Sequence, residues 1–573
     1  MITSSKKENL AIFFLLVFSV SVFFGFGLFH ITKFETADEH LWKYGRIKQY
    51  WQSIKNKDWK RTYINDKPGV TIALFSGSAL LLEPNPENHK ITDPNLTRNG
   101  LFNVYDIEKT DHINFIFRFP VLVISSLSLF LFFWLAFKSF YSKKLALLAT
   151  VFIATSPVLV GISQIVNPDS FFWIFGGLSI FSFLALLNTQ EKKFVLITGI
   201  LTGFALLSKY TAVALFVFYF LAIFSKIIFS EPKEKKYCQN FYFVARMVFY
   251  EFIILLVSVA IFSIFLPAVF VKPDYLLKGI SQFFEAKAIF AFLGIAILFL
   301  IPSFYFKKNI EWIFEKLGKN KRIILATISL LFLLVVLLIV LNSWTGQVAV
   351  PFDKLRDAAY ANEPKKFNFG TLLKHDNEFV KNTKLFLMEP YPFIFSLTPL
   401  TFFLVIFITF KSFLKKIKES SSFLLVPSFL FFLVYFALTV YSGVVANVRY
   451  SIIFYPLFAL LSAMAILELF DTLKMAKKKN ILAAALVVFL LGSLTLWNEK
   501  PFYFGYTSFL LPKKFTITQS WGHGTYEAAE YLNSLPDAKN KIIWSNTNTI
   551  CMFFVGNCLN TRKIDLNVVT PDY

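Results

Sequence analysis

The chain has 573 residues, of which 56% are hydrophobic and only 16% are charged. Because soluble globular proteins are about 45–50% apolar and about 25% charged, this composition excludes a large soluble enzyme, a disordered chain and a secreted disulfide scaffold. The net charge of +22 would suit nucleic-acid binding in a soluble protein, but in a membrane protein it indicates an excess of lysine and arginine in the cytoplasmic loops.

The apolar residues gather in thirteen blocks, which predicts an all-α polytopic membrane protein, because about 20 apolar residues span the hydrocarbon layer. The first block follows Lys6 and Lys7. It is longer than the apolar region of a signal peptide and no cleavage site of small residues follows it, so we interpret it as an uncleaved anchor. If the shortest block, 194–208, did not cross the membrane, the orientation of every span after it would be reversed. The predicted spans are 10–30, 113–137, 145–163, 170–188, 194–208, 211–230, 243–271, 286–306, 323–342, 393–410, 423–441, 450–470 and 480–497.

Lysine-rich loops alternate along the chain with loops that carry almost no cations. The positive-inside rule assigns the lysine-rich loops to the cytoplasm, and every loop fits one arrangement in which the N-terminus is cytoplasmic. The membrane is expected to be a bacterial-type plasma membrane. The predicted cytoplasmic clusters fall at 138–144, 192–193, 233–236, 307–322, 411–418 and 474–479. The short outer loops fall near 164–169, 208–210 and 442–449.

This arrangement predicts a transmembrane domain over residues 1–497 with two long outer loops, 31–112 and 343–392. The segment 498–573 is then expected to form a small extracytoplasmic α/β domain. Its sequence GHGTYEAAEYLNSLP predicts an amphipathic helix that ends at Pro536. The stretches 541–545 and 549–556 are typical of strands.

Two of the three cysteines, Cys551 and Cys558, fall in this C-terminal segment. An oxidising space outside the membrane allows them to pair, but spacing alone does not fix the geometry, so a disulfide and two free thiols both stay open. Trp521 and Tyr526 are expected to pack in the core of the same domain, with stacking on a sugar as the alternative. The six histidines show no metal-ligand spacing, so we interpret them as structural or solvated.

The first outer loop opens with ETADEHLWKYGRIKQYWQSI, residues 35–54. Apolar and aromatic residues recur in it at helical spacing, with lysine and arginine on the other faces. This pattern predicts a helix that lies in the membrane interface and is anchored by aromatic side chains. The apolar face consists of Leu41, Tyr44, Ile47, Trp51 and Ile54.

Charged residues also occur where the membrane disfavours them. Asp38 and Glu39 directly follow the first span, and they either cap the next helix, where negative charge is favoured, or belong to a site. Three more residues at the same predicted level favour a site: Asp169 in NPDS, Lys209 inside an almost continuous apolar stretch, and Arg449 at the start of a span. Asp169 also suits a helix cap, and the Lys209 side chain can extend to the surface.

Together these acids and cations predict a pocket at the outer membrane face that binds a membrane-borne anion and performs acid–base chemistry beside it. The guanidinium of Arg449 stays charged and can hold a phosphate through two hydrogen bonds, and the Lys209 ammonium also suits an anion. Gly199 and Gly203, four residues apart, predict close packing of their helix against a neighbour.

Seven motifs in this order resemble one family, although no single motif is specific. The chain resembles the C-type (GT-C) membrane glycosyltransferases of the protein mannosyltransferase and aminoarabinose transferase group, which are glycosyltransferase family 39-like. The resemblance spans nearly the whole chain. The motifs are the acidic pair at 38–39, KPGVT at 67–71, RFP at 118–120, NPD at 167–169, GxxxGxALLSKYT at 199–211, RYxxxxYP at 449–456 and WGxGxYEAAEYLN at 521–533.

The resemblance implies an enzyme that takes a sugar from a polyprenyl-phosphate carrier on the non-cytoplasmic face and transfers it to a lipid, glycan or protein hydroxyl. It implies Asp38 as the catalytic base. Lys67 stands where many bacterial relatives have the histidine of an HPG motif. The predicted site residues are therefore the acids Asp38, Glu39 and Asp169 for catalysis and the cations Lys209, Arg449 and Lys67 for the donor phosphate.

The same groups can also be derived from the chemistry of the reaction, independently of the resemblance. Outside the membrane no nucleotide sugar is available, so the donor must arrive on a lipid carrier. Its phosphate leaves without a general acid but needs cations as negative charge develops, while the acceptor hydroxyl needs a base. Attack in line from the side of Asp38 predicts inversion of the anomeric centre.

Alternative functions and cofactors follow from the same residues. Asp38, Glu39 and Asp169 offer oxygen ligands for Mg²⁺ or Mn²⁺, but we expect no cofactor and do not favour a catalytic metal. The expected partners are the donor, its acceptor and membrane lipids, without nucleic acid. A transporter or flippase of lipid-linked saccharides is the main rival, although the chain shows no symmetric halves. A polymerase or ligase of surface glycans is the second.

Overall fold

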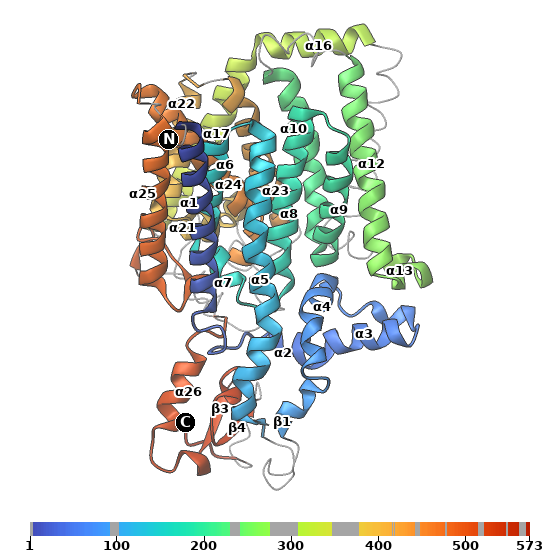
Figure 1. Cartoon of the computed structure of the whole chain (residues 1–573), viewed down its shortest axis with the longest axis vertical. Helices are drawn as coiled ribbons and strands as arrows, with labels where there is room; N and C mark the ends of the chain where they lie inside the picture. Colours follow the sequence, from blue (N-terminus) through green and yellow to red (C-terminus); the bar gives the residue numbers. More distant parts are fainter. Residues whose placement is uncertain are drawn as a thin grey trace.

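The computed structural model is a bundle of mostly long helices whose axes run roughly parallel (Figure 1). In the part of the chain that it describes, nine helices are long and apolar enough to cross a membrane. They are α1 (Ser4–Leu28), α5 (Ile107–Phe140), α8 (Pro168–Thr189), α10 (Ala214–Phe229, continuous with the 3₁₀ turn η5 at Tyr210–Val213), α12 (Phe241–Phe265), α17 (Lys321–Thr345), α23 (Glu419–Tyr441), α24 (Phe454–Thr472) and α25 (Lys478–Glu499). The described residues are 4–91, 102–229, 241–275, 307–345, 377–414, 416–417, 419–441, 447–475, 478–513, 521–545, 548–560 and 569–573.

Three predicted spans fall on shorter helices. The block 145–163 was predicted as one span, and this is wrong: it divides into α6 (Lys143–Ala154) and α7 (Pro157–Ile162). The break precedes Pro157, because proline lacks an N–H and disfavours helical geometry in the residue before it. The other two are α9 (Lys193–Ser208) and α22 (Pro399–Phe413), which follows the separate turn α21 (Tyr391–Ser396).

The count of thirteen spans stays a prediction. The block 286–306 lies outside the described residues, as does most of the outer loop 343–392, of which the part near its end forms α20 (Glu378–Met388). The close packing predicted for Gly199 and Gly203 is confirmed, because a Cβ on either would lie 2.7 Å from Val257 or Ile261 of α12. α8 lies at the centre of the bundle, and its apolar stretch is completely buried.

The two ends of the bundle differ. The N-terminus and the lysine-rich helix α16 (Lys307–Lys319) lie at one end, and the first outer loop and the C-terminal segment lie at the other (Figure 1). These described segments are therefore separated as the charge pattern predicts. Which end faces the outside is a proposal that rests on the positive-inside rule.

The first outer loop forms α2 (Glu39–Leu41), a π-helical turn η1 (Trp42–Arg46) and α3 (Ile47–Lys55), which lies across the bundle axis (Figure 1). The predicted helix is present, but the apolar face was predicted wrongly for its first residues. Trp42 and Lys43 are buried, and Leu41 is exposed. A π-turn holds more residues than an α-turn, so it rotates the residues before it relative to those after it.

The rest of this loop is compact. It contains the 3₁₀ turns η2 (Trp59–Thr62), η3 (Gly77–Leu81) and η4 (Pro86–His89) and the short helix α4 (Val70–Ser76). Strands β1 (Lys90–Ile91) and β2 (Val104–Tyr105) pair antiparallel. α12 is followed by the single turn α13 (Ala268–Val271), which contacts this loop at Thr62.

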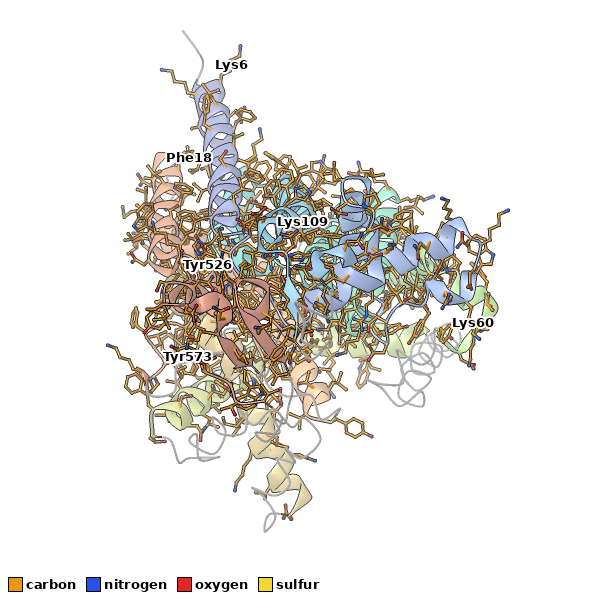
Figure 2. The ribbon with its side chains drawn as sticks, turned by 90° about the horizontal axis from the view of Figure 1, so that it is seen from below. Lys6, Phe18, Lys60, Lys109, Tyr526 and Tyr573 are labelled. Carbon is orange, nitrogen blue, oxygen red and sulfur yellow. A yellow bond between two sulfur atoms is a disulfide. The ribbon has the colours of Figure 1, made fainter. Side chains whose placement is uncertain are left out.

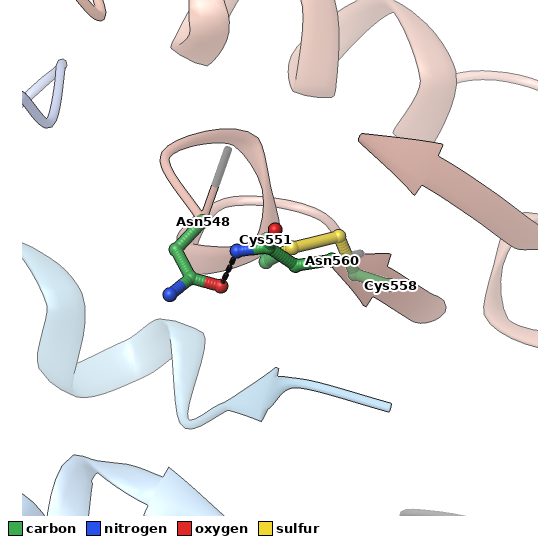
Figure 3. The surroundings of a disulfide bond; sticks show 4 residues. All are labelled: Asn548, Cys551, Cys558 and Asn560. Carbon is green, nitrogen blue, oxygen red and sulfur yellow. Dashed lines mark hydrogen bonds between the residues drawn. A yellow bond between two sulfur atoms is a disulfide. The ribbon is translucent and has the colours of Figure 1, made fainter. Parts of the chain in front are cut away.

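The C-terminal segment contains α26 (Thr525–Asn533) and the strands β3 (Ile542–Ser545) and β4 (Asn557–Asn560), which pair in parallel with Ile542 opposite Asn557. The helix and the first strand occur where the sequence predicts them. Cys551 and Cys558 form a disulfide, which resolves the alternative left open above (Figure 3).

The strand predicted over 549–556 is wrong. Residues Ile550–Met552 form the 3₁₀ turn η10, and the strand begins only at Asn557. Seven extended residues would separate the two cysteines by about 23 Å, whereas their Cα atoms lie 5.3 Å apart. The segment between them must therefore turn back on itself.

Candidate functional site

Four charged side chains that the sequence predicts at one level form a continuous cluster at the end of the bundle beside α2. The Lys209 ammonium donates to Asp169 Oδ1 at 2.6 Å. Arg449 lies between two acids: its Nε is 3.1 Å from Asp169 Oδ2 and its Nη2 is 3.0 Å from Asp38 Oδ2. The predicted convergence of acids and cations is therefore present in the structure. We call these four residues the charged cluster.

Local backbone signals place the members of the cluster. Asn167 precedes α8, and its side chain accepts the N–H of Asp169 at 3.0 Å. Asn447 does the same for Arg449 at the start of the 3₁₀ turn η6 (Val448–Ser451), also at 3.0 Å. Asparagine is a favoured N-cap because its carbonyl satisfies a free N–H at the start of a helix. Lys209 occupies the extended residue between α9 and η5.

The two acids of the cluster differ in exposure. The Asp38 side chain is 40% exposed, whereas that of Asp169 is 1% exposed and lies between the two cations. Burial alone would lower the pKa of Arg449, but the carboxylates of Asp169 and Asp38 raise it above its ordinary value. Asp38 is thus the acid that a ligand can reach, and Asp169 is the one that holds both cations.

Two aromatic rings cover the cations. The Lys209 ammonium lies 4.4 Å from the centre of the Tyr450 ring, and the Arg449 guanidinium lies 4.0 Å from that of Trp521. Such cation–π contacts are attractive and restrict the side chain that makes them. Trp521 was predicted to pack in the core of the C-terminal segment, and this is wrong: its ring packs on Phe504 and Arg449.

The segment that carries Trp521 is locked against the first outer loop. Gly522 has a φ of +100°, and a Cβ there would lie 1.7 Å from the carbonyl oxygen of Glu35. The next residue, His523, stacks on Phe34 with ring centres 4.3 Å apart. Only glycine permits this approach of two backbones, which brings the aromatic ring of Trp521 to the charged cluster.

Glu39 does not join the charged cluster. Its carboxylate is completely buried and accepts from Arg118 of α5 on both oxygens, at 2.8 Å from Nε and 2.5 Å from Nη2. The N–H groups of Val166 and Thr36 donate to the same carboxylate at 2.8 and 3.0 Å. Because Val166 lies three residues before Asp169, Glu39 connects the loop of Asp38 to the loop of Asp169.

A second buried pair adjoins the first. The Lys43 ammonium donates to Glu35 Oε2 and to Asn114 Oδ1, each at 2.5 Å, and Arg118 also donates to the carbonyl of Ile31. We call Glu35, Glu39, Lys43 and Arg118 the buried network. No role was predicted for Glu35 or Arg118 from the sequence. Lys43 was predicted on a face other than the apolar one, but its side chain is completely buried. An ion pair between residues 79 apart, such as Glu39 and Arg118, leaves no local signal.

Burial and neighbouring charges determine the protonation of the buried network. Burial would raise the pKa of Glu39, but the Arg118 guanidinium outweighs it and lowers the pKa to about 2. For Glu35, burial outweighs the attraction of Lys43 and raises the pKa to about 7. Burial lowers the pKa of Lys43. Glu39 is therefore the firmly ionised acid of the network.

Lys67 lies near the charged cluster but is not part of it. Gly69, two residues on, has a φ of +60°, and its N–H donates to the carbonyl of Ser208 at 3.2 Å. The Thr71 and Ser208 hydroxyls are 2.9 Å apart. These contacts hold the KPG turn beside Lys209. Lys67 itself is half-buried and makes no ion pair with the described residues.

The acids predicted as metal ligands are turned toward cations. Asp38 and Asp169 are held by Arg449 and Lys209, and Glu39 by Arg118. Across the described ranges, no group of three or more His, Cys, Asp or Glu residues is arranged to hold a metal ion. Burial lowers the pKa of His40 and His89 to about 4 and that of His523 to about 3, so these rings are neutral.

The central segment of the chain matches a known family model. Residues 97–274, which include Arg118, Asp169 and Lys209, match the family model described as "Dolichyl-phosphate-mannose-protein mannosyltransferase". The predicted resemblance to GT-C membrane glycosyltransferases is confirmed. No curated protein matches the chain.

Two solved structures are similar to this chain. One is the archaeal oligosaccharyltransferase AglB from Archaeoglobus fulgidus in complex with an inhibitory peptide and a dolichol-phosphate, at 13% identity and a TM-score of 0.40, over 92% of this chain and 58% of that one. The other is the A. fulgidus oligosaccharyltransferase tethered to an acceptor peptide with the NVT sequon, with the same identity and TM-score, over 92% and 57%. The chain thus spans less than two thirds of the length of either.

Proposed function

We propose that the protein is an integral membrane glycosyltransferase that moves a sugar from a polyprenyl-phosphate donor to a hydroxyl of a lipid, glycan or protein on the outer face of the membrane. The observation that carries the proposal is the charged cluster, in which Asp38, Asp169, Lys209 and Arg449 meet from four distant segments. The family match of residues 97–274 supports the same reaction class.

In this proposal the donor phosphate binds Arg449 and Lys209. These cations compensate the negative charge that grows on the phosphate oxygen as the bond to the sugar breaks. Binding of the phosphate to Arg449 displaces Asp38, which is the exposed acid of the cluster. Asp38 is then free to act as a base, whereas Asp169 keeps both cations in place.

The reaction is a single displacement. Asp38 takes the proton of the acceptor hydroxyl, the acceptor oxygen forms a bond to the anomeric carbon, and the bond from that carbon to the phosphate oxygen breaks. The electron pair leaves with the polyprenyl phosphate, and the anomeric configuration inverts. Glu39 acts as a positioning residue, because it connects the loops of Asp38 and Asp169 through Val166. We propose that no metal takes part, since cations already hold the three acids.

Replacement of Asp38 by asparagine is expected to lower sugar transfer by about 10²–10⁴-fold, the usual contribution of a general base. The chain is purified in nanodiscs and given a panel of radiolabelled polyprenyl-phosphate sugars with candidate acceptors, and release of polyprenyl phosphate is measured. Asp58→Asn, at an exposed acid of the same loop, is the matched control.

Three outcomes of this assay would contradict the proposal. Transport of the intact donor without cleavage would favour a flippase. A normally folded and fully active Asp38→Asn variant would remove Asp38 from the role of base. Loss of turnover in a strong chelator, restored by Mg²⁺ or Mn²⁺, would show that a metal takes part.

Removal of the Trp521 ring is expected to weaken donor binding more than the chemical step. Without the ring, Arg449 loses one of the groups that restrict it. A cation–π contact contributes about 0.5–2 kcal/mol, so Trp521→Ala should raise the KM for the donor by up to about 30-fold and change kcat less. Trp521→Phe should restore part of the affinity. Steady-state kinetics with Tyr531→Ala, an exposed aromatic of α26, as control measure this, and an unchanged donor KM would contradict it.

A further inference from the structure

The first outer loop carries a basic surface that the proposed reaction does not use. Residues 55–61, with the sequence KNKDWKR, run from the last residue of α3 into η2, and all seven are exposed. They include four cations and one acid. No ion pair of these four cations occurs among the described residues, although Lys48 nearby is paired with Glu87. We call residues 55–61 the basic tip.

The basic tip lies at the edge of the molecule. Viewed from below, Lys60 is at the rim, far from Lys109 and Tyr526 (Figure 2). α3 lies across the bundle axis and extends outward beneath α12 (Figure 1). No hydrogen bond or ion pair among the described residues joins the tip to the charged cluster.

Hydrogen bonds fix the depth of the basic tip relative to the membrane. The Tyr50 hydroxyl donates to the carbonyl of Phe265, the last residue of α12, at 2.7 Å. The N–H of Ala268, three residues further on, donates to the Thr62 hydroxyl at 3.0 Å. In the structure, the apolar helix long enough to cross a membrane here ends at Phe265, six residues before the end of the span predicted from the sequence. The residues on both sides of the tip are therefore held at the end of this apolar helix.

The surface beside the tip is apolar. Phe270 of α13 is 72% exposed, and Val271 and Ile264 are also exposed. Trp59 within the tip is 41% exposed. Tryptophan is favoured at the boundary between acyl chains and headgroups, and cations next to a lipid-facing surface attract anionic headgroups. The surface thus offers an apolar part for the acyl chains of a lipid, a tryptophan for the boundary and cations for its phosphate.

We propose that the basic tip binds the phosphate headgroup of an anionic phospholipid of the surrounding leaflet, with Phe270 and Val271 against its acyl chains. Lys55, Lys57, Lys60 and Arg61 hold the phosphate, and Trp59 lies at the boundary. The bound lipid keeps the first outer loop at a constant height beside the bundle. This interaction does not depend on sugar transfer.

The test uses the full chain in phosphatidylcholine nanodiscs that contain a trace of photoactivatable phosphatidylglycerol. Crosslinked peptides are mapped by mass spectrometry, and we expect lipid on peptides of the basic tip and α13. In Lys55→Gln/Lys57→Gln/Lys60→Gln the labelling should fall at least about fivefold, because three of the four cations are lost. The control Lys90→Gln/Lys109→Gln/Lys539→Gln loses the same charge elsewhere at this end and should be labelled like the wild type.

Salt provides a measurement that needs no variant. Raising the salt concentration from about 0.1 M to about 1 M shortens the screening length from about 10 Å to about 3 Å and should reduce labelling of the wild type. Equal labelling by photoactivatable phosphatidylcholine would overturn the proposal, as would a tip variant labelled like the wild type. Stronger competition by unlabelled polyprenyl phosphate than by phosphatidylglycerol would assign the surface to the carrier lipid and also overturn it.

Discussion

Replacement of Arg118 by leucine is expected to destabilise the protein by about 3–5 kcal/mol, the usual effect of removing one partner of a buried ion pair. The Arg118 side chain is completely buried, and its guanidinium contacts Glu39, Glu35 and the carbonyl of Ile31. Without it, the Glu39 carboxylate is left buried with no opposite charge in contact. Leucine cannot donate a hydrogen bond to any of these groups.

The effect is measured as the midpoint of thermal unfolding and the yield of monodisperse protein in detergent. Arg322→Leu, at an exposed arginine near the start of α17, is the matched control and should behave like the wild type. The double variant Arg118→Leu/Glu39→Gln removes the unpaired charge as well. It should be more stable than Arg118→Leu alone, because the two residues are coupled. A single variant with unchanged stability would show that the buried network does not support the fold.

Replacement of Asp169 by asparagine is expected to separate donor binding from catalysis. Asparagine has nearly the same shape but removes the negative charge between Lys209 and Arg449. Both cations are then less neutralised, so the KM for the donor should stay the same or fall. Their positions are no longer fixed, and since misplacement by about 1 Å can lower a rate 10²-fold, kcat should fall by about that factor.

Steady-state kinetics over donor concentration measure both quantities, with Asp58→Asn as the exposed control. The comparison with Asp38→Asn distinguishes the two acids, because loss of the base lowers kcat without releasing Lys209. A raised KM with unchanged kcat in Asp169→Asn would mean that Asp169 contributes only to ground-state binding. That result would leave the cations without their proposed role in the transition state.

The charged cluster could be predicted because each of its members is a charged residue within or directly beside an apolar block, where such residues are rare. Once the loops are assigned to two sides, Asp38, Asp169, Lys209 and Arg449 all fall at one level, and the structure brings them into contact. The residues that hold the cluster in place carry no such signal. Lys43 is buried because a π-turn rotates it inward.

The long helices could be predicted from apolar length, and their breaks from proline. Pro157 divides the block 145–163, and Pro399 begins α22 six residues after the predicted start. Apolar length alone does not distinguish one span from two short helices. The turn before β4 was missed because the hydrophobic stretch TICMFFVG suits a strand, and only the disulfide between Cys551 and Cys558 excludes it.

The contact between Gly522 and Glu35 has a consequence for the order in which the protein matures. The backbone of a residue near the end of the chain lies directly on that of a residue near its beginning, and the ring beside Gly522 completes the surroundings of Arg449. A nascent chain whose helices have already inserted therefore still lacks the Trp521 ring beside Arg449. This ring is in place only after Trp521 has been translated and its segment has docked. The surroundings of Arg449 are therefore completed only after all four members of the charged cluster have been synthesised.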